Sequence, residues 1–177
     1  GVLCDFEGRP LPLLVQIPRE LEELLQKRGW PLYVPESYGS YTAGARVLIS
    51  SALSGGSLSQ RLRDALNQYG QGRVVLAVER VAGDFFLPSP DGQGTPLSRE
   101  ALSTMLEQRA PSIFFSDQLC AHYFTYMAPD NGAHFVLFDD AGSIRKKLLL
   151  ARNLGIRQAV LAYPQVDDLL EDILREA

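Results

Sequence analysis

The sequence is poor in the residues that build metal centres, disulfide frameworks and membrane spans. It has two cysteines and two histidines among 177 residues, and their spacing does not suit a zinc site. No apolar run is long enough to cross a membrane as a helix. The net charge of −4 argues against nucleic acid as a partner. We therefore expect no metal, no cofactor and no membrane span, with Cys4 and Cys120 as small buried side chains.

What the sequence does contain is an alternation of apolar runs with amphipathic helices. The hydrophobic content of 46% and the charged content of 21% are typical of a globular protein, and the length suits one domain. Apolar runs of Val, Leu and Ile joined by such helices indicate a parallel sheet covered by helices. The expected strands lie at residues 1–7, 31–34, 46–50, 73–78 and 158–162. The expected helices lie at residues 18–28, 57–69, 141–154 and 167–175.

This alternation is interrupted between residues 80 and 138. A loop rich in Pro, Gly and Asp is followed by an expected helix at 98–108. Aromatic-rich runs come next, and their composition is typical of strands. They lie at residues 113–115, 122–127 and 134–138. We expect a small antiparallel insertion of strands around one helix.

Polar side chains stand where each expected parallel strand ends. In a (β/α) barrel the catalytic residues come from the carboxyl ends of several strands, which meet at one rim. The first strand is the most informative, because Asp5 and Glu7 project from the same face and can share acid–base work. The residues at the ends of the strands are Asp5, Glu7, Glu36, Ser50, Ser51, Glu79, Tyr163 and Gln165.

Two segments resemble glycoside hydrolase family 18, the chitinase-like (β/α)8 barrels. The run Gly1-Val2-Leu3-Cys4-Asp5-Phe6-Glu7 is similar to the family's fourth-strand signature, Asp-Gly-x-Asp-x-Asp-x-Glu. The run from Phe138 through Asp139, Asp140, Ser143 and Lys147 resembles the family's Tyr-Asp-Asp-x-x-Ser-x-x-x-Lys segment, which leads into the eighth strand.

The resemblance implies a partial (β/α)8 TIM barrel. Residues 1–177 would be its C-terminal part, strands four to eight, with outer helices and an α+β insertion after the seventh strand at about 80–138. Five strands cannot close such a barrel, so two open sheet edges are expected. Either the natural protein is longer on its N-terminal side, or another copy covers these edges by self-association.

The resemblance also implies roles for individual residues. Glu7 matches the general acid, and Asp5 matches the carboxylate that orients the substrate's 2-acetamido group, which is the nucleophile in this family. The substrate would then be an N-acetylated glycan of the chitin or peptidoglycan type. Further substrate-binding residues are expected at the strand ends, namely Glu36, Tyr38, Glu79 and Tyr163. Such a protein would be secreted or lie in the cell envelope.

The chain departs from the family pattern at three strands. Leu3 stands where the family has its middle Asp. The sixth-strand Met-x-Tyr-Asp, which helps to hold the acetamido group, is replaced by the run Val47-Leu48-Ile49-Ser50-Ser51. Tyr163 stands in place of the Trp that is usual after strand eight. These losses remove a charge partner and substrate-positioning groups, which can cost orders of magnitude in rate.

Three hypotheses of function follow. The first is a family-18-like hydrolase when intact, with no activity expected of the isolated chain. The second is a non-catalytic barrel that binds a glycan or a protein. Aromatic platforms for sugars suit both, and the candidates are Trp30, Tyr33, Tyr38, Tyr41, Tyr123 and Tyr126. The third, weakest hypothesis is a nucleophile at Ser50 or Ser51 with His122 or His134 as base, although no Gly-x-Ser-x-Gly motif is present.

Overall fold

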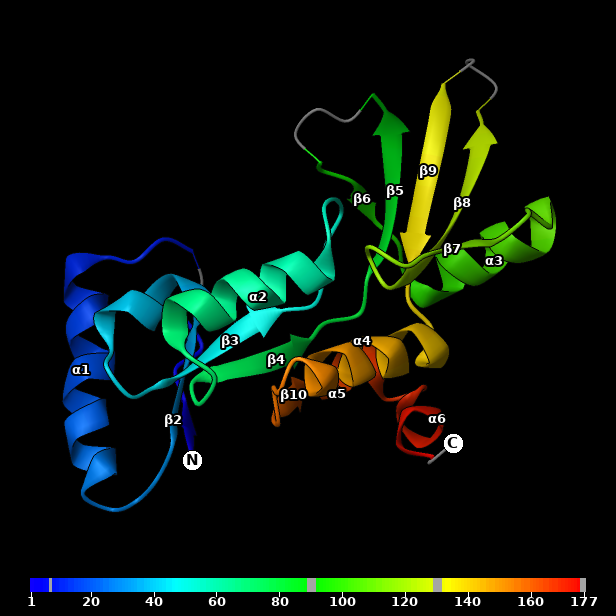
Figure 1. The fold of residues 1–177 in the computed structure, drawn as a ribbon. Helices are drawn as coiled ribbons and strands as arrows, with labels where there is room; N and C mark the ends of the chain where they lie inside the picture. Colours follow the sequence, from blue (N-terminus) through cyan, green and yellow to red (C-terminus); the bar gives the residue numbers. More distant parts are fainter. Residues whose placement is uncertain (7, 89–91, 129–131, 176–177) are drawn as a thin grey trace.

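Two five-stranded sheets make up the fold, and Figure 1 shows them apart, linked by the chain from β4 to β5 and by the chain from β9 to helix α4. The structure, a computed structural model, describes residues 1–6, 8–88, 92–128 and 132–175. The first sheet has the order β1-β2-β3-β4-β10 and the second has the order β6-β5-β9-β8-β7.

The first sheet is parallel throughout, and its strands follow one another in sequence order, as predicted. Its register places Val2 beside Leu32, Val34 beside Val47 and Val160 beside Ala77. The sheet is curled, and it is consistent with part of a (β/α) barrel. Its strands are β1 (Val2–Leu3), β2 (Leu32–Pro35), β3 (Arg46–Ser50), β4 (Val74–Val78) and β10 (Ala159–Leu161).

The two faces of this sheet differ because side chains alternate along each strand. The outer face carries the main core, where Val34, Val47, Ile49 and Leu76 are fully buried. The inner face is less covered by other elements, and its side chains are most exposed on the two edge strands, β1 and β10. Leu3 on β1 is 49% exposed.

Helices pack on the outer face of the sheet (Figure 1). Local sequence sets where they begin. The Ser57 side chain accepts a hydrogen bond from the Gln60 amide at the start of α2, and Asp140 with Ser143 forms a capping box at the start of α4. The elements of this layer are α1 (Pro12–Gln26), the 3-10 helix η1 (Glu36–Tyr41), α2 (Leu58–Tyr69), α4 (Ala141–Asn153), α5 (Tyr163–Val166) and α6 (Leu170–Leu174).

The second sheet is antiparallel and lies between β4 and α4 in the sequence. Helix α3 (Arg99–Arg109) covers one face, where Leu102 packs with Phe124 and Val136. The other face packs around Phe85 and Leu137. The strands are β5 (Ala82–Leu87), β6 (Thr95–Pro96), β7 (Phe114–Ser116), β8 (Ala121–Met127) and β9 (Ala133–Phe138).

Several elements differ from the sequence prediction. Helix α1 begins earlier than predicted, at Pro12, because proline fits the first turn, and it continues through Pro18, which lies buried inside the helix instead of at its start. The last predicted helix, 167–175, is shorter in the structure, where α6 spans only Leu170–Leu174, and the short helix α5 precedes it at Tyr163–Val166, where no helix was predicted. Strand β5 was not predicted, because Gly83 and Asp84 break its apolar pattern.

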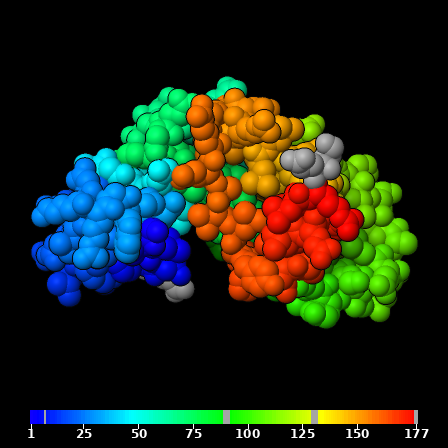
Figure 2. Space-filling view, turned by 90° about the horizontal axis from the view of Figure 1, so that it is seen from below, coloured from blue at the N-terminus to red at the C-terminus, as the bar shows by residue number. Residues whose placement is uncertain are grey.

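The first sheet curls without closing. Figure 2, a view from below, shows an arch in which the dark blue N-terminal strand and the red C-terminal helices stand on either side of a hollow. Strands β1 and β10 are the two edges of the sheet. The hollow therefore lies on the side of the inner face.

Candidate functional site

Three predicted polar residues share the inner face at the carboxyl ends of their strands. Directly after β1, the Cys4 amide still donates to the Tyr33 carbonyl and the Cys4 side chain is buried in the core, so that Asp5, the next residue, projects to the opposite, exposed face. Ser50 ends β3, where it pairs with Ala77, and Glu79 follows β4. Because Val78 is buried on the outer face, Glu79 also lies on the inner face. The parallel order thus brings these groups to one rim.

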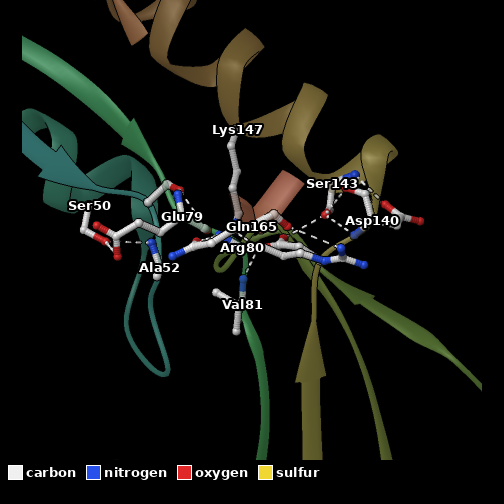
Figure 3. A network of polar contacts seen from close by, with 11 residues as sticks. Ser50, Ala52, Glu79, Arg80, Val81, Asp140, Ser143, Lys147 and Gln165 are labelled. Atoms are coloured by element: carbon white, nitrogen blue, oxygen red, sulfur yellow. Dashed lines mark hydrogen bonds and ion pairs between the residues drawn. The ribbon is translucent and has the colours of Figure 1, made fainter. Parts of the chain in front are cut away.

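Ser50 and Glu79 form a hydrogen-bonded pair at this rim (Figure 3). The Ser50 hydroxyl donates to Oε2 of Glu79 at 2.9 Å and accepts from the Ala52 amide at 3.1 Å. The buried Ser51 hydroxyl accepts from the Glu79 amide and donates to the Glu79 carbonyl, at 3.3 and 3.5 Å. Both the backbone and the carboxylate of Glu79 are therefore fixed.

Arg80, the next residue, ties β4 to the chain after β10. Its guanidinium donates to both carboxylate oxygens of Asp168, at 2.8 and 3.0 Å. Its amide donates to Oε1 of Gln165. From α3, Arg99 pairs with Asp167, and the hydrogen bond from Arg99 lowers the pKa of the Asp167 carboxyl. These contacts fasten the C-terminal segment to both sheets.

A buried polar network lies behind the rim. Lys147 and Asp139, both fully buried, pair at 2.6 Å between Nζ and Oδ2. Asp139 also accepts from the Ser143 hydroxyl at 2.7 Å and from the Val81 amide at 2.9 Å. The neighbouring Asp140 caps α4 and pairs with His122 at 3.2 Å. The segment that resembles the family thus joins the second sheet to α4 (Figure 3).

The other predicted site residues lie elsewhere. Glu36 pairs with Arg61 of α2 at 2.5 Å, so its carboxylate turns toward the helix layer. Tyr38 is fully buried and its ring packs on Phe6 at 5.0 Å, so it belongs to the core and is not a surface platform. Tyr163 is 63% exposed at the start of α5. Glu7 lies outside the described residues.

The remaining aromatic candidates are divided between the two sheets. Trp30 is 53% exposed beside β2, while Tyr126 of β8 stacks on His134 with 4.6 Å between ring centroids. Tyr123 stacks on both Phe114 and Phe135 in a ladder across the second sheet. The structure therefore does not gather these rings at one place.

The serines and histidines of the third hypothesis are not brought together. Ser50 and Ser51 bond to Glu79, whereas His122 pairs with Asp140 and His134 pairs with Asp84 on the second sheet. In the described ranges no group of three His, Cys, Asp or Glu side chains is placed to hold a metal ion. No helix there is long and apolar enough to cross a membrane.

Sequence reasoning placed Gln165 at the rim but did not anticipate Arg61 or Arg80 as partners there. For Arg80 the available signal was its position, because it stands two residues after the end of β4. The two cysteines match the prediction, being 5% and 7% exposed at Cys4 and Cys120. Burial raises the pKa of both thiols.

A curled parallel sheet with polar groups at its carboxyl ends is typical of (β/α) barrel enzymes, and solved structures of such enzymes share this fold. The spore cortex-lytic enzyme SleL of Bacillus megaterium QM B1551 superposes with a TM-score of 0.63 at 17% identity, over 91% of this chain and 45% of that one. The putative sporulation-specific glycosylase ydhD of Bacillus subtilis gives 0.63 at 14% identity, over 84% and 59%. A chitinase from Chromobacterium violaceum ATCC 12472 gives 0.59 at 14% identity, over 84% and 55%.

A curated relative is also a lytic enzyme of this kind by its name. The cortical fragment-lytic enzyme of Bacillus subtilis (strain 168) is 30% identical over 116 residues, which are 61% of this chain and 27% of that enzyme. No protein-family model matches the chain. The chain therefore has the fold of part of a family-18-like chitinase or cortex-lytic enzyme, as the two motifs predict, and it spans about a quarter to three fifths of the proteins it matches.

Proposed function

We propose that this chain is the C-terminal part of a (β/α)8 barrel that hydrolyses N-acetylated glycans of the chitin or peptidoglycan type. Its second sheet would then be the α+β insertion that follows the seventh barrel strand. One observation carries the proposal: the strands follow in sequence order, and Asp5, Ser50 and Glu79 lie at their carboxyl ends on one face.

The proposed mechanism uses Glu7 and Asp5. Glu7 donates a proton to the glycosidic oxygen, and Asp5 orients the 2-acetamido group that attacks the anomeric carbon. The exposure of Asp5 on the inner face supports this role, since a glycan in the hollow would lie against that face. Glu79 and Tyr163 are proposed to contact the same glycan. A secreted or cell-envelope location would suit such a substrate.

The test is cleavage of an N-acetylglucosamine oligomer by the intact protein. We expect Glu7→Gln to abolish cleavage while binding is nearly unchanged, because the amide keeps the shape but cannot donate the proton. Asp5→Asn should lower the rate strongly. Wild-type turnover in Glu7→Gln would show that the acid is assigned to the wrong residue.

A second candidate is a barrel that binds a glycan or a protein without cleaving it. The observation in its favour is that Ser50 and Ser51, where the resemblance expects a Tyr-Asp pair, are engaged with Glu79. In this case the intact protein binds the oligomers and never cleaves them.

A further inference from the structure

The Glu79 carboxylate holds a negative charge at the rim with no cationic partner among the described residues. The cations of the surrounding elements pair with other carboxylates. Arg61 pairs with Glu36 and also donates from Nε to the Ser50 carbonyl at 3.4 Å, Arg80 pairs with Asp168, and Lys147 pairs with Asp139. A partly buried carboxylate without a counter-charge is costly unless something else stabilises it. The position is therefore suited to a positively charged ligand group.

The same carboxylate is also rigid, which a binding group requires. Oε2 is occupied by the Ser50 hydroxyl, whose own orientation is set by the Ala52 amide. The backbone on both sides of the side chain is held by Ser51. Within the described part of the chain no hydrogen bond reaches Oε1. One directional acceptor is thus presented on the inner face.

We propose that Glu79, positioned by Ser50, binds the primary ammonium of an amino sugar that has lost its N-acetyl group. The inference rests on the proposed function and makes it more specific, since the glycan would then be only partly N-acetylated. An ammonium offers three donors and a full charge, and charge-assisted hydrogen bonds are about twice as strong as neutral ones. An acetamido group offers one neutral N–H and leaves the carboxylate charge unbalanced.

The experiment compares two probes on the intact protein, the tetramer of N-acetylglucosamine and the tetramer of glucosamine. Affinities are measured by calorimetry near pH 6 at low ionic strength, where the sugar amine is protonated. We expect the wild type to bind the glucosamine tetramer about tenfold more tightly or better, a preference that salt weakens.

The variants separate three effects: the local charge of Glu79, the positioning of its carboxylate by Ser50, and the net charge of the protein. Glu79→Gln keeps the shape and removes the charge, so the preference for the glucosamine tetramer should disappear. Ser50→Ala should reduce the preference several-fold. Ser50→Thr, which keeps the hydroxyl, should keep the wild-type preference. The matched control is Glu20→Gln, because Glu20 is exposed on α1 and its loss changes the net charge equally. This control should keep the wild-type preference.

The outcomes distinguish this inference from the function on which it rests. If the wild type binds neither tetramer, the proposed glycan function fails and the inference fails with it. If the wild type binds the N-acetylated tetramer as tightly as the other, or if Glu79→Gln keeps the preference, only the ammonium assignment is overturned. Equal loss of preference in Glu20→Gln would assign the effect to net charge and overturn it as well.

Discussion

Lys147 and Asp139 form an ion pair in which neither side chain has any exposure to solvent, with 2.6 Å between Nζ and Oδ2. Lys147 lies on α4, and Asp139 directly follows β9. The Val81 amide, from the crossing between β4 and β5, completes the set of donors to Asp139. A single carboxylate therefore joins the second sheet, the parallel sheet and the helix layer.

Removal of one partner of this pair should destabilise the protein strongly. We expect Lys147→Met to lower the free energy of unfolding by about 3–5 kcal/mol, because the Asp139 charge would stay buried without compensation. Urea unfolding followed by circular dichroism measures the change. Lys146→Met is the control, since Lys146 is exposed and its Nζ lies over the Phe115 ring, so its loss should cost about 1 kcal/mol or less. Equal effects of the two substitutions would contradict the prediction.

The open edges of the parallel sheet should make the isolated chain self-associate. Among the described residues β1 and β10 have no further neighbouring strand, and Leu3 on β1 and Val160 on β10 are 49% and 36% exposed. Light scattering at increasing concentration should show dimers or larger species. Leu3→Lys with Val160→Lys should shift the chain toward the monomer, because charge at an edge opposes strand pairing. A wild-type chain that stays monomeric at high concentration would rule this out.

The contact between Arg99 and Asp167 predicts a dependence of stability on pH. The hydrogen bond from Arg99 lowers the pKa of Asp167 in the folded protein, so the unfolded chain takes up this proton at a higher pH. The contribution is present above the ordinary carboxyl pKa of about 3.9 and is lost as the pH falls through the lowered value. Thermal unfolding between pH 2 and 6 should show a smaller acid loss for Asp167→Asn than for the wild type. Identical pH profiles would show that the pair adds nothing.

Both thiols should resist alkylation in the folded protein. Cys4 and Cys120 are nearly inaccessible, and burial raises the pKa of each, so that little thiolate is present at pH 8. Iodoacetamide followed by mass spectrometry should give slow labelling of the native chain and rapid labelling in denaturant. Fast labelling of Cys4 alone would show that β1 detaches from β2.

The parallel sheet was predictable because its strands are short apolar runs with clear helices between them. The strand at 46–50, the helix at 58–69 and the strand order all agree with the sequence pattern. Strand β5 escaped prediction because Gly83 and Asp84 interrupt its apolar pattern, and its stability comes from pairing with β9, which is far along the chain. Pairing over such a distance leaves little local signal.

The candidate site was predictable in its position but less so in its members. Placing polar groups at strand ends correctly located Ser50 beside Glu79. The same reasoning placed Tyr38 at the rim, whereas η1 turns its ring into the core against Phe6. Periodicity does not report such a turn after a strand. The pairing of Arg61 with Glu36 likewise depends on how α2 packs, which a single sequence does not specify.

The residues at which the chain enters and leaves the second sheet are adjacent, because Ala82 at the start of β5 pairs with Phe138 at the end of β9. The Val81 carbonyl also accepts from the Asp139 amide just outside that pair. The chain therefore enters the second sheet after β4 and leaves it toward α4 at almost the same point. Because this insertion is attached at one point, we expect that evolution can lengthen, shorten or exchange it without changing the strand order of the parallel sheet.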